Sequence, residues 1–235
     1  MFTLKVFQFF SSIKSGLILA VIYLFVIALI VVIWLQTLIS PELLLRDVFT
    51  LTDVPPYYGL LSNFGIFLWC TTASVSLFSA VILSYKKRER GFSLFFLFFG
   101  LISLILMLDD GLLLHESVVP KILENIFSYN TAEMLLPLSY GSAVIYSLLK
   151  FRKIILNTNY KFLFLALLFL FFSLVADHLI PLPDGGRYWL RDGENFLIED
   201  GFKLLGIVTW SFYFIQTSLS RIIYLTRHTG ANRLK

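Results

Sequence analysis

Residues 91–116 read GFSLFFLFFGLISLILMLDDGLLLHE, and this stretch decides the fold class. From Gly91 to Leu108 it holds no charged side chain. A helix that crosses a bilayer needs about 20 mostly apolar residues, because the hydrocarbon core is about 30 Å thick and the helix rises about 1.5 Å per residue. The stretch therefore predicts a transmembrane helix that ends near Leu114. Asp109 and Asp110 interrupt it close to that end and need their own explanation.

The composition of the whole chain agrees with a membrane protein. Of the 235 residues, 58% are hydrophobic and 14% are charged, whereas a soluble domain carries about 45–50% apolar and about 25% charged residues. These values exclude a soluble globular domain, a nucleic-acid-binding protein, a disulfide scaffold and a disordered chain. The single cysteine, Cys70, cannot form an internal disulfide. We expect the lipid bilayer as the principal partner and no nucleic acid.

Six stretches are long and apolar enough to span the bilayer. They predict transmembrane helices over 15–40, 59–85, 91–114, 132–149, 162–180 and 196–224. The fold class that follows is all-α: a polytopic integral membrane helix bundle that forms a single transmembrane domain over residues 1–235.

The charges orient this bundle. Taking alternate connections, one side holds 14 of the 19 lysines and arginines but only one of the 15 acidic residues, Glu89. Because Lys and Arg accumulate on the cytoplasmic side, both termini are predicted to be cytoplasmic. The expected location is the cell membrane, plasma or inner. The other 14 acids lie outside and need a reason, since acidic residues contribute little to orientation.

Ionisable side chains gather at one depth on three of the predicted helices. Counted from the cytoplasmic ends at about 1.5 Å per residue, Asp109 lies roughly 27 Å up, Asp177 roughly 22 Å and Lys203 roughly 26 Å. All three positions fall at or just under the outer boundary of the hydrocarbon. Because a charge in this region costs free energy, an intramembrane ionisable group predicts a functional site.

One interpretation of this layer is a metal site. On an ideal helix Asp109 and Glu116 share a face but lie about 10 Å apart, too far to bind one ion without other helices. The candidate ligands are therefore Asp109, His115 and Glu116 together with Asp177 and His178. Histidines with carboxylates suit a divalent metal, with zinc favoured.

Three functions are compatible with the layer. The first is a metal-dependent membrane enzyme acting on a lipid-like substrate, with Glu199 or Asp200 as the general base, since a bound metal lowers the pKa of its water to about 7. The second is an ion- or proton-coupled carrier that uses the same carboxylates and Lys203. The third is a non-catalytic membrane subunit, in which Asp110 and Lys203 belong to a structural charge network that locks the helices together.

Overall fold

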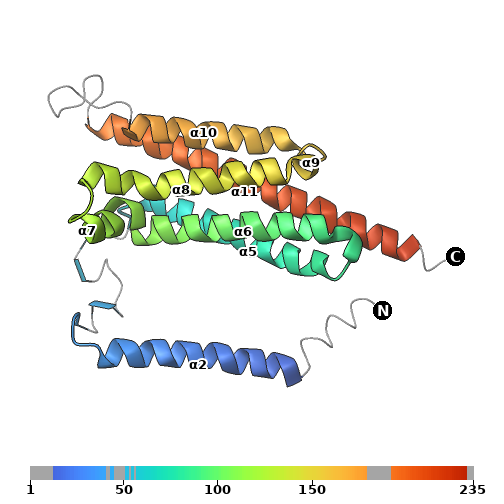
Figure 1. The fold of residues 1–235 in the computed structure, drawn as a ribbon, viewed down its shortest axis with the longest axis horizontal. Helices are drawn as coiled ribbons and strands as arrows, with labels where there is room; N and C mark the ends of the chain where they lie inside the picture. The colour runs from blue at the N-terminus through green and yellow to red at the C-terminus, as the bar shows by residue number, and fades with distance from the viewer. Residues whose placement is uncertain are drawn as a thin grey trace. The chain divides into compact units, whose positions relative to one another are not determined.

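The computed structural model describes residues 13–40, 43–44, 51–52, 54–55, 57–178 and 192–231. All regular structure within these residues is helical, and no strand occurs in them. The chain divides into two compact units, residues 1–58 and 59–235, which are described separately (Figure 1).

The first unit contains helix α2, Ile13–Leu35. Its stretch Tyr23–Leu35 is apolar but shorter than a full span. The helix ends five residues before the predicted end at residue 40, because the Gln36 side chain competes for the backbone. Its Oε1 accepts hydrogen bonds from the backbone N–H groups of Leu38 and Ile39, both at 2.9 Å. Such local side-chain bonds favour a turn over a continued helix.

Within its described residues, the second unit contains five long helices and several short helical segments between them. The long helices are α5 (Leu60–Ser84), α6 (Arg90–Leu112), α8 (Tyr129–Lys150), α10 (Tyr160–His178) and α11 (Asp192–Ala231). The connections contain η1 (Lys87–Glu89), η2 (Leu114–Val118), α7 (Val119–Leu123) and α9 (Arg152–Ile155). Helix α5 packs against α6 and α11, and α11 also packs against α10.

Among the described residues, three helices are long and apolar enough to cross a membrane: Leu60–Ser84, Lys87–Leu112 and Thr131–Lys150. Tyr160–Ala176 is a shorter apolar helix. The chain is therefore an all-helical protein with helices suited to a bilayer. Six spans, cytoplasmic termini and one transmembrane domain stay predictions, and residues 179–180 of the fifth predicted helix lie outside the described part.

Helix α11 is longer than any span requires. It runs from Asp192 to Ala231, 40 residues, where the sequence predicted residues 196–224. At about 1.5 Å per residue it is roughly 60 Å long, twice the hydrocarbon thickness. Figure 1 shows its C-terminal end reaching past the neighbouring helices. This end carries Arg221 and Arg227, side chains that favour the aqueous boundary over the hydrocarbon.

An aromatic cluster forms the core of the second unit. Trp69 of α5 and Trp210 of α11 meet edge to face with their ring centroids 5.9 Å apart. Phe99 of α6 lies 5.1 Å from Phe214 of α11, measured between ring centroids. All four side chains are buried, as is Phe95 of α6 beside them. Large aromatic side chains bury much apolar area, so this cluster ties α5, α6 and α11 together.

Small and hydroxyl-bearing residues let the backbones of neighbouring helices approach. Between α5 and α11, the Thr72 hydroxyl donates to Ser211 Oγ at 2.7 Å, and Ser79 bonds to Ser218. Between α10 and α11, a Cβ placed on Gly206 would lie 2.7 Å from Leu170 Cγ. Close approach through small residues is the usual way in which membrane helices pack.

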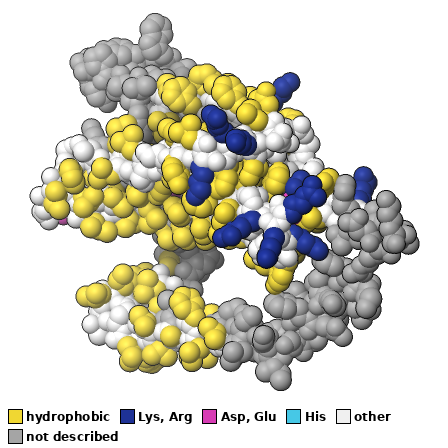
Figure 2. Space-filling view, turned by 45° about the vertical axis from the view of Figure 1, so that its right-hand side comes forward, with side chains coloured by type: hydrophobic (Ala, Val, Ile, Leu, Met, Phe, Trp, Pro, Cys, Tyr) yellow, Lys and Arg dark blue, Asp and Glu magenta, His cyan; other side chains and the backbone are white. Residues whose placement is uncertain are grey.

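The two ends of the second unit differ in charge. The basic end carries Lys86–Arg90, Lys150–Lys153 and Arg221, and Figure 2 shows lysine and arginine side chains gathered there on the right. The acidic end carries Asp109, Asp110, His115 and Glu116.

Candidate functional site

The candidate site at the acidic end begins where helix α6 stops. The sequence predicted a helix to Leu114, but α6 ends at Leu112, and Leu113 adopts the left-handed conformation with φ 50°. A π-helical turn, Leu114–Val118, follows directly. The ideal-helix spacing of Asp109 and Glu116, two turns apart on one face, is therefore wrong, because the helix is broken between them. A left-handed residue without the freedom of glycine stores strain, and π turns recur at functional sites.

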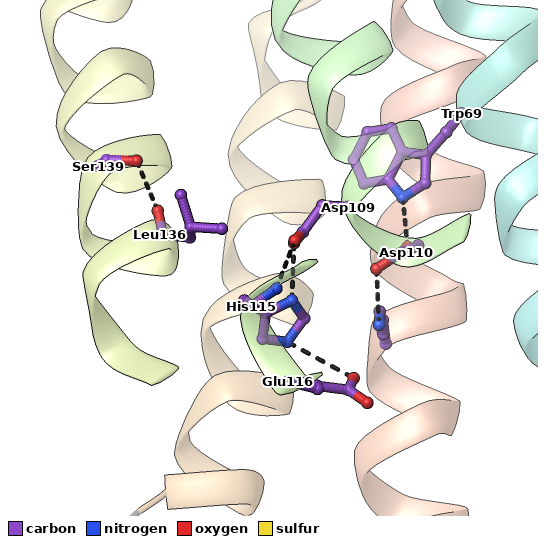
Figure 3. Close-up of polar contacts among 8 residues, drawn as sticks. Trp69, Asp109, Asp110, His115, Glu116, Leu136 and Ser139 are labelled. Carbon is purple, nitrogen blue, oxygen red and sulfur yellow. Dashed lines mark hydrogen bonds and ion pairs between the residues drawn. The ribbon is translucent and has the colours of Figure 1, made fainter. Parts of the chain in front are cut away.

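The broken helix folds His115 back onto Asp109. The backbone N–H of His115 donates to Asp109 Oδ1 at 2.9 Å, and the ring atom Nδ1 lies 2.7 Å from Asp109 Oδ2 (Figure 3). The Asp109 residue is 3% exposed. The other ring nitrogen, Nε2, lies 3.5 Å from Glu116 Oε1. Tyr140 of α8 also interacts with the Asp109 carboxylate. One imidazole thus lies between a buried carboxylate and a half-exposed one.

This environment favours a protonated imidazole. The hydrogen bond to Asp109 is the largest influence, and it raises the pKa of His115 above the ordinary 6.5. Burial acts in the opposite direction, as does the positive charge of Lys203, while the negative charges of Asp109 and Glu116 raise the pKa further. The net shift is upward because the charged form gains an opposite charge at hydrogen-bonding distance.

Asp110 points to a different set of partners. Lys203 Nζ of α11 lies 2.9 Å from Asp110 Oδ1, and the indole Nε1–H of Trp69 on α5 donates to Asp110 Oδ2 at 3.0 Å. Figure 3 shows Asp109 and Asp110 turned to separate partners. Three helices therefore meet at one carboxylate, whose charge is compensated within the bundle.

A small cavity lies beside this second set. Its volume is about 20 Å³, and Asp110, Lys203, Asp200 and Ser62 are among the residues that line it. A water molecule needs roughly 10–15 Å³ of such space together with polar partners. The cavity therefore has room for about one water between the carboxylates and the ammonium, and not for a substrate.

The remaining candidate residues predicted from the sequence lie on α10 and on α11. Asp177 and His178 are the last residues of α10, and their side chains lie outside the described part of the structure. Glu199 and Asp200 are half-buried on α11, and Asp200 acts electrostatically on Lys203.

The predicted metal set is brought together only in part. Asp109, His115 and Glu116 are neighbours, but within the described residues no group of three or more His, Cys, Asp or Glu side chains is arranged to hold a metal ion. Metal binding by Asp109, His115, Glu116, Asp177 and His178 stays a prediction, as does the role of Glu199 or Asp200 as general base.

Two residues of the site, Trp69 and Tyr140, were not predicted from the sequence. The depth of Trp69 in the membrane could have identified it as a partner of Asp110. Counted at about 1.5 Å per residue from the cytoplasmic ends of their predicted helices, Trp69 lies about 24 Å above Tyr85 and Asp110 about 28 Å above Gly91. No such depth argument identifies Tyr140 as a partner of Asp109. Its contact with Asp109 depends on how α8 packs beside α6.

Fold and site together define a helical protein whose described part holds helices long and apolar enough to cross a membrane and, at one end, a histidine bonded to a buried aspartate. The chain belongs to the family described as a domain of unknown function (DUF8692), which it matches over residues 17–217. Comparison with curated proteins and with solved structures finds no match.

Proposed function

We propose that the chain is a multi-pass membrane protein in which His115 exchanges a proton with a lipid-like substrate at the acidic end. One observation carries the proposal: the buried Asp109 carboxylate contacts both the backbone N–H and Nδ1 of His115. These two contacts fix the ring and direct Nε2 toward Glu116, whose side chain is 48% exposed. An oriented imidazole with one nitrogen toward an accessible rim is the arrangement that general acid–base catalysis needs.

The chemistry that follows is proton transfer at Nε2. A water molecule bonds to the ester or phosphodiester centre of the substrate, and as the bond from that centre to the departing oxygen breaks, the protonated ring gives this oxygen its proton. The proton that the attacking water loses returns to the neutral ring, so the ring ends protonated as it began. Asp109 stabilises the charged ring and keeps the second nitrogen in place, as a carboxylate partner does for catalytic histidines. Glu199 and Asp200 on α11 stay the candidates for a separate general base.

The position of the pair supports a lipid-like substrate. His115 comes three residues after the candidate span Lys87–Leu112, where the sequence predicts the boundary between hydrocarbon and headgroups. A water-soluble substrate would have to approach this boundary from outside, whereas the headgroup or ester of a lipid is already there.

A second candidate function is the structural charge network of a non-catalytic subunit. The contacts of Asp110 with Lys203 and Trp69 favour it, because they join α5, α6 and α11 and compensate the carboxylate. The two candidate functions use different residues of the acidic end. Asp110 and Lys203 hold the helices together, and Asp109 and His115 form the reactive pair.

The test is lipid turnover by the full-length chain reconstituted in vesicles. Vesicles of phosphatidylethanolamine, phosphatidylglycerol and a neutral diacyl lipid are incubated with wild type, His115→Asn and the control Glu124→Gln. Glu124 is an exposed acid of the same connection, following α7. Mass spectrometry of the lipids follows headgroup or acyl loss.

The proposal expects turnover by wild type and by Glu124→Gln and at least a hundred-fold loss in His115→Asn, in line with the usual contribution of general acid–base catalysis. Equal turnover by His115→Asn contradicts it. No turnover by any form favours the structural network instead. Metal analysis of the same purified protein tests the prediction of a zinc-dependent enzyme. One zinc per chain in wild type that is lost in His115→Asn supports this prediction, and a wild type without bound zinc after zinc addition overturns it.

A further inference from the structure

At the basic end, the ammonium group of Lys150 lies over aromatic rings. Lys150 is the last residue of α8, and its Nζ atom lies 3.9 Å from the ring centroid of Phe98 on α6. The centroids of Tyr146 and Phe151 lie 5.3 and 5.5 Å from the same atom. A cation over the face of an aromatic ring at such distances is attracted electrostatically. Three rings therefore hold this ammonium where α6 and α8 meet.

Lys150 also lies at the level where lipid headgroups are expected. It is the last residue of the candidate span Thr131–Lys150, and it is exposed. The polar headgroups of a bilayer lie directly outside the hydrocarbon that such a span crosses. Basic side chains at this level attract anionic lipids. A lipid phosphate can therefore reach the ammonium from the side of the bundle.

No carboxylate of the basic end is left to pair with this ammonium. Across residues 84–92, 150–161 and 220–231, which the structure describes, the one acidic residue is Glu89. Its two carboxylate oxygens accept hydrogen bonds from Arg221 at 2.6 and 2.7 Å, and it is 2% exposed. The charge of the lysine is therefore uncompensated within these segments, which favours an anion from outside the chain.

Further cations lie near this ammonium. Arg152 and Lys153 follow on α9, and both are exposed. Helix α9 lies against the start of α6, since a Cβ placed on Gly91 would lie 3.4 Å from Ile154 Cδ1. This contact brings Arg90, which is exposed as well, to the same part of the bundle. A phosphate group, with its negative charge and several acceptor oxygens, suits such a set of charged donors.

An apolar strip on α6 leads away from these cations. Its members are exposed and follow one another at three or four residues, which places them on one face of the helix: Leu97, Leu101, Ile105 and Leu108. Phe98 lies three residues before Leu101, so the strip begins beside the ring nearest the ammonium. Lipid tails are as apolar as leucine and pack along such a surface. A dissolved phosphate gains nothing from it, so cation and strip together favour a phospholipid.

We propose that an anionic phospholipid binds where α6, α8 and α9 meet, with its phosphate on Lys150 and an acyl chain along the apolar strip. Lys150 Nζ donates to a phosphate oxygen, and Arg152 and Lys153 add positive charge around the headgroup. Phe98, below the ammonium, and Asp109 lie roughly 16 Å apart along α6. The lipid site is therefore separate from the acid–histidine pair, and its lipid is bound without being a substrate.

The experiment uses the full chain in nanodiscs of phosphatidylcholine with a minor fraction of phosphatidylglycerol that carries the same acyl chains. Native mass spectrometry of the released protein measures how strongly it retains one lipid over the other. Lys150→Met removes the charge at similar length, and Lys150→Arg keeps it. The matched control is Lys161→Met, which removes an exposed lysine near the start of α10, a helix that packs against α11. Wild type is also measured in an excess of inorganic phosphate and in chloride of the same ionic strength.

The proposal expects wild type, Lys150→Arg and Lys161→Met to prefer phosphatidylglycerol equally. It expects Lys150→Met to lower this preference about five-fold, the contribution of one basic side chain at an anionic membrane surface. Equal losses in Lys150→Met and Lys161→Met overturn the proposal in favour of a diffuse attraction by the whole basic end. No preference in wild type overturns it as well. Loss of the retained lipid in phosphate but not in chloride overturns it in favour of a site for dissolved phosphate. Elution volume and helical circular dichroism verify that Lys150→Met folds.

Discussion

The Nδ1 atom of His115 lies 2.7 Å from Oδ2 of Asp109, six residues earlier in the chain, and this contact closes the broken end of helix α6. A continuous helix would place residues six apart on different faces. The left-handed Leu113 and the π turn that follows make the contact possible, so the geometry of the candidate site depends on a local departure from the helix.

The stability of the folded chain depends on pH through this pair. The pKa of His115 is raised by folding, so its contribution is complete below about pH 6.5 and is lost as the pH rises through the folded-state pKa. The groups that set this pKa are Asp109, Glu116 and Lys203. We expect the difference in melting temperature between wild type and His115→Asn to be largest below about pH 6.5 and to shrink as the pH rises through the folded-state pKa of His115. Thermal unfolding in detergent measures it, and a difference that grows with rising pH contradicts the assigned shift.

The second prediction concerns the salt bridge between Asp110 and Lys203. Lys203→Met leaves the carboxylate buried without its cation. Since the lysine side chain is 31% exposed and that of Asp110 10%, the expected destabilisation is about 2 kcal/mol, between a surface and a buried pair. The double variant Asp110→Leu with Lys203→Met recovers most of it, because no charge then remains unpaired. Chemical unfolding of four forms, the wild type, Asp110→Leu, Lys203→Met and the double variant, gives the coupling. Additive losses in the double variant would count against the pairing.

The basic end contains a more deeply buried pair. Arg221→Met leaves Glu89, 2% exposed, without a counter-charge, and a loss of about 3–5 kcal/mol is expected for breaking a pair of this kind. Arg227→Met removes an exposed arginine six residues further along the same helix and should change stability by less than about 0.5 kcal/mol. Unfolding curves of both variants test the contrast, and similar losses in the two would refute it.

Two glycines of α11 give a matched test of helix packing. A Cβ on Gly206 would lie 2.8 Å from Leu170 Cδ2 and 3.1 Å from the Leu170 backbone nitrogen, whereas a Cβ on Gly201 meets nothing within 4 Å. Gly206→Ala therefore forces α10 and α11 apart and should cost about 1–3 kcal/mol. Gly201→Ala should stabilise the chain by about 0.5–1 kcal/mol, since alanine restricts the unfolded state and favours a helix. Melting temperatures that move in the same direction would contradict this packing.

The sequence predicts the parts of the structure that depend on local composition. The positions of α5, α6 and α8 follow from apolar length, because that requirement is met within each stretch. Depth counting also places Asp109 and Lys203 in one layer, since the helical rise is constant.

Other features depend on tertiary packing or on a single dihedral angle. Nothing in the run of leucines at 112–114 marks Leu113 as left-handed, and Gly111, the residue with that freedom, stands two positions earlier. The pair of Glu89 and Arg221 joins residues 132 positions apart, and it forms only when α11 packs beside the start of α6. Which partner each carboxylate selects could not be predicted for the same reason.

The central claim is that Asp109 positions and charges the imidazole of His115, and an NMR titration of that ring tests it most directly. The Asp109 hydrogen bond is the largest cause of the raised pKa, and the charge of Glu116 contributes less. We predict a His115 pKa above 6.5 in the wild type, a large fall in Asp109→Asn and a smaller fall in Glu116→Gln. A His115 pKa that is the same in the wild type and in Asp109→Asn would contradict the account.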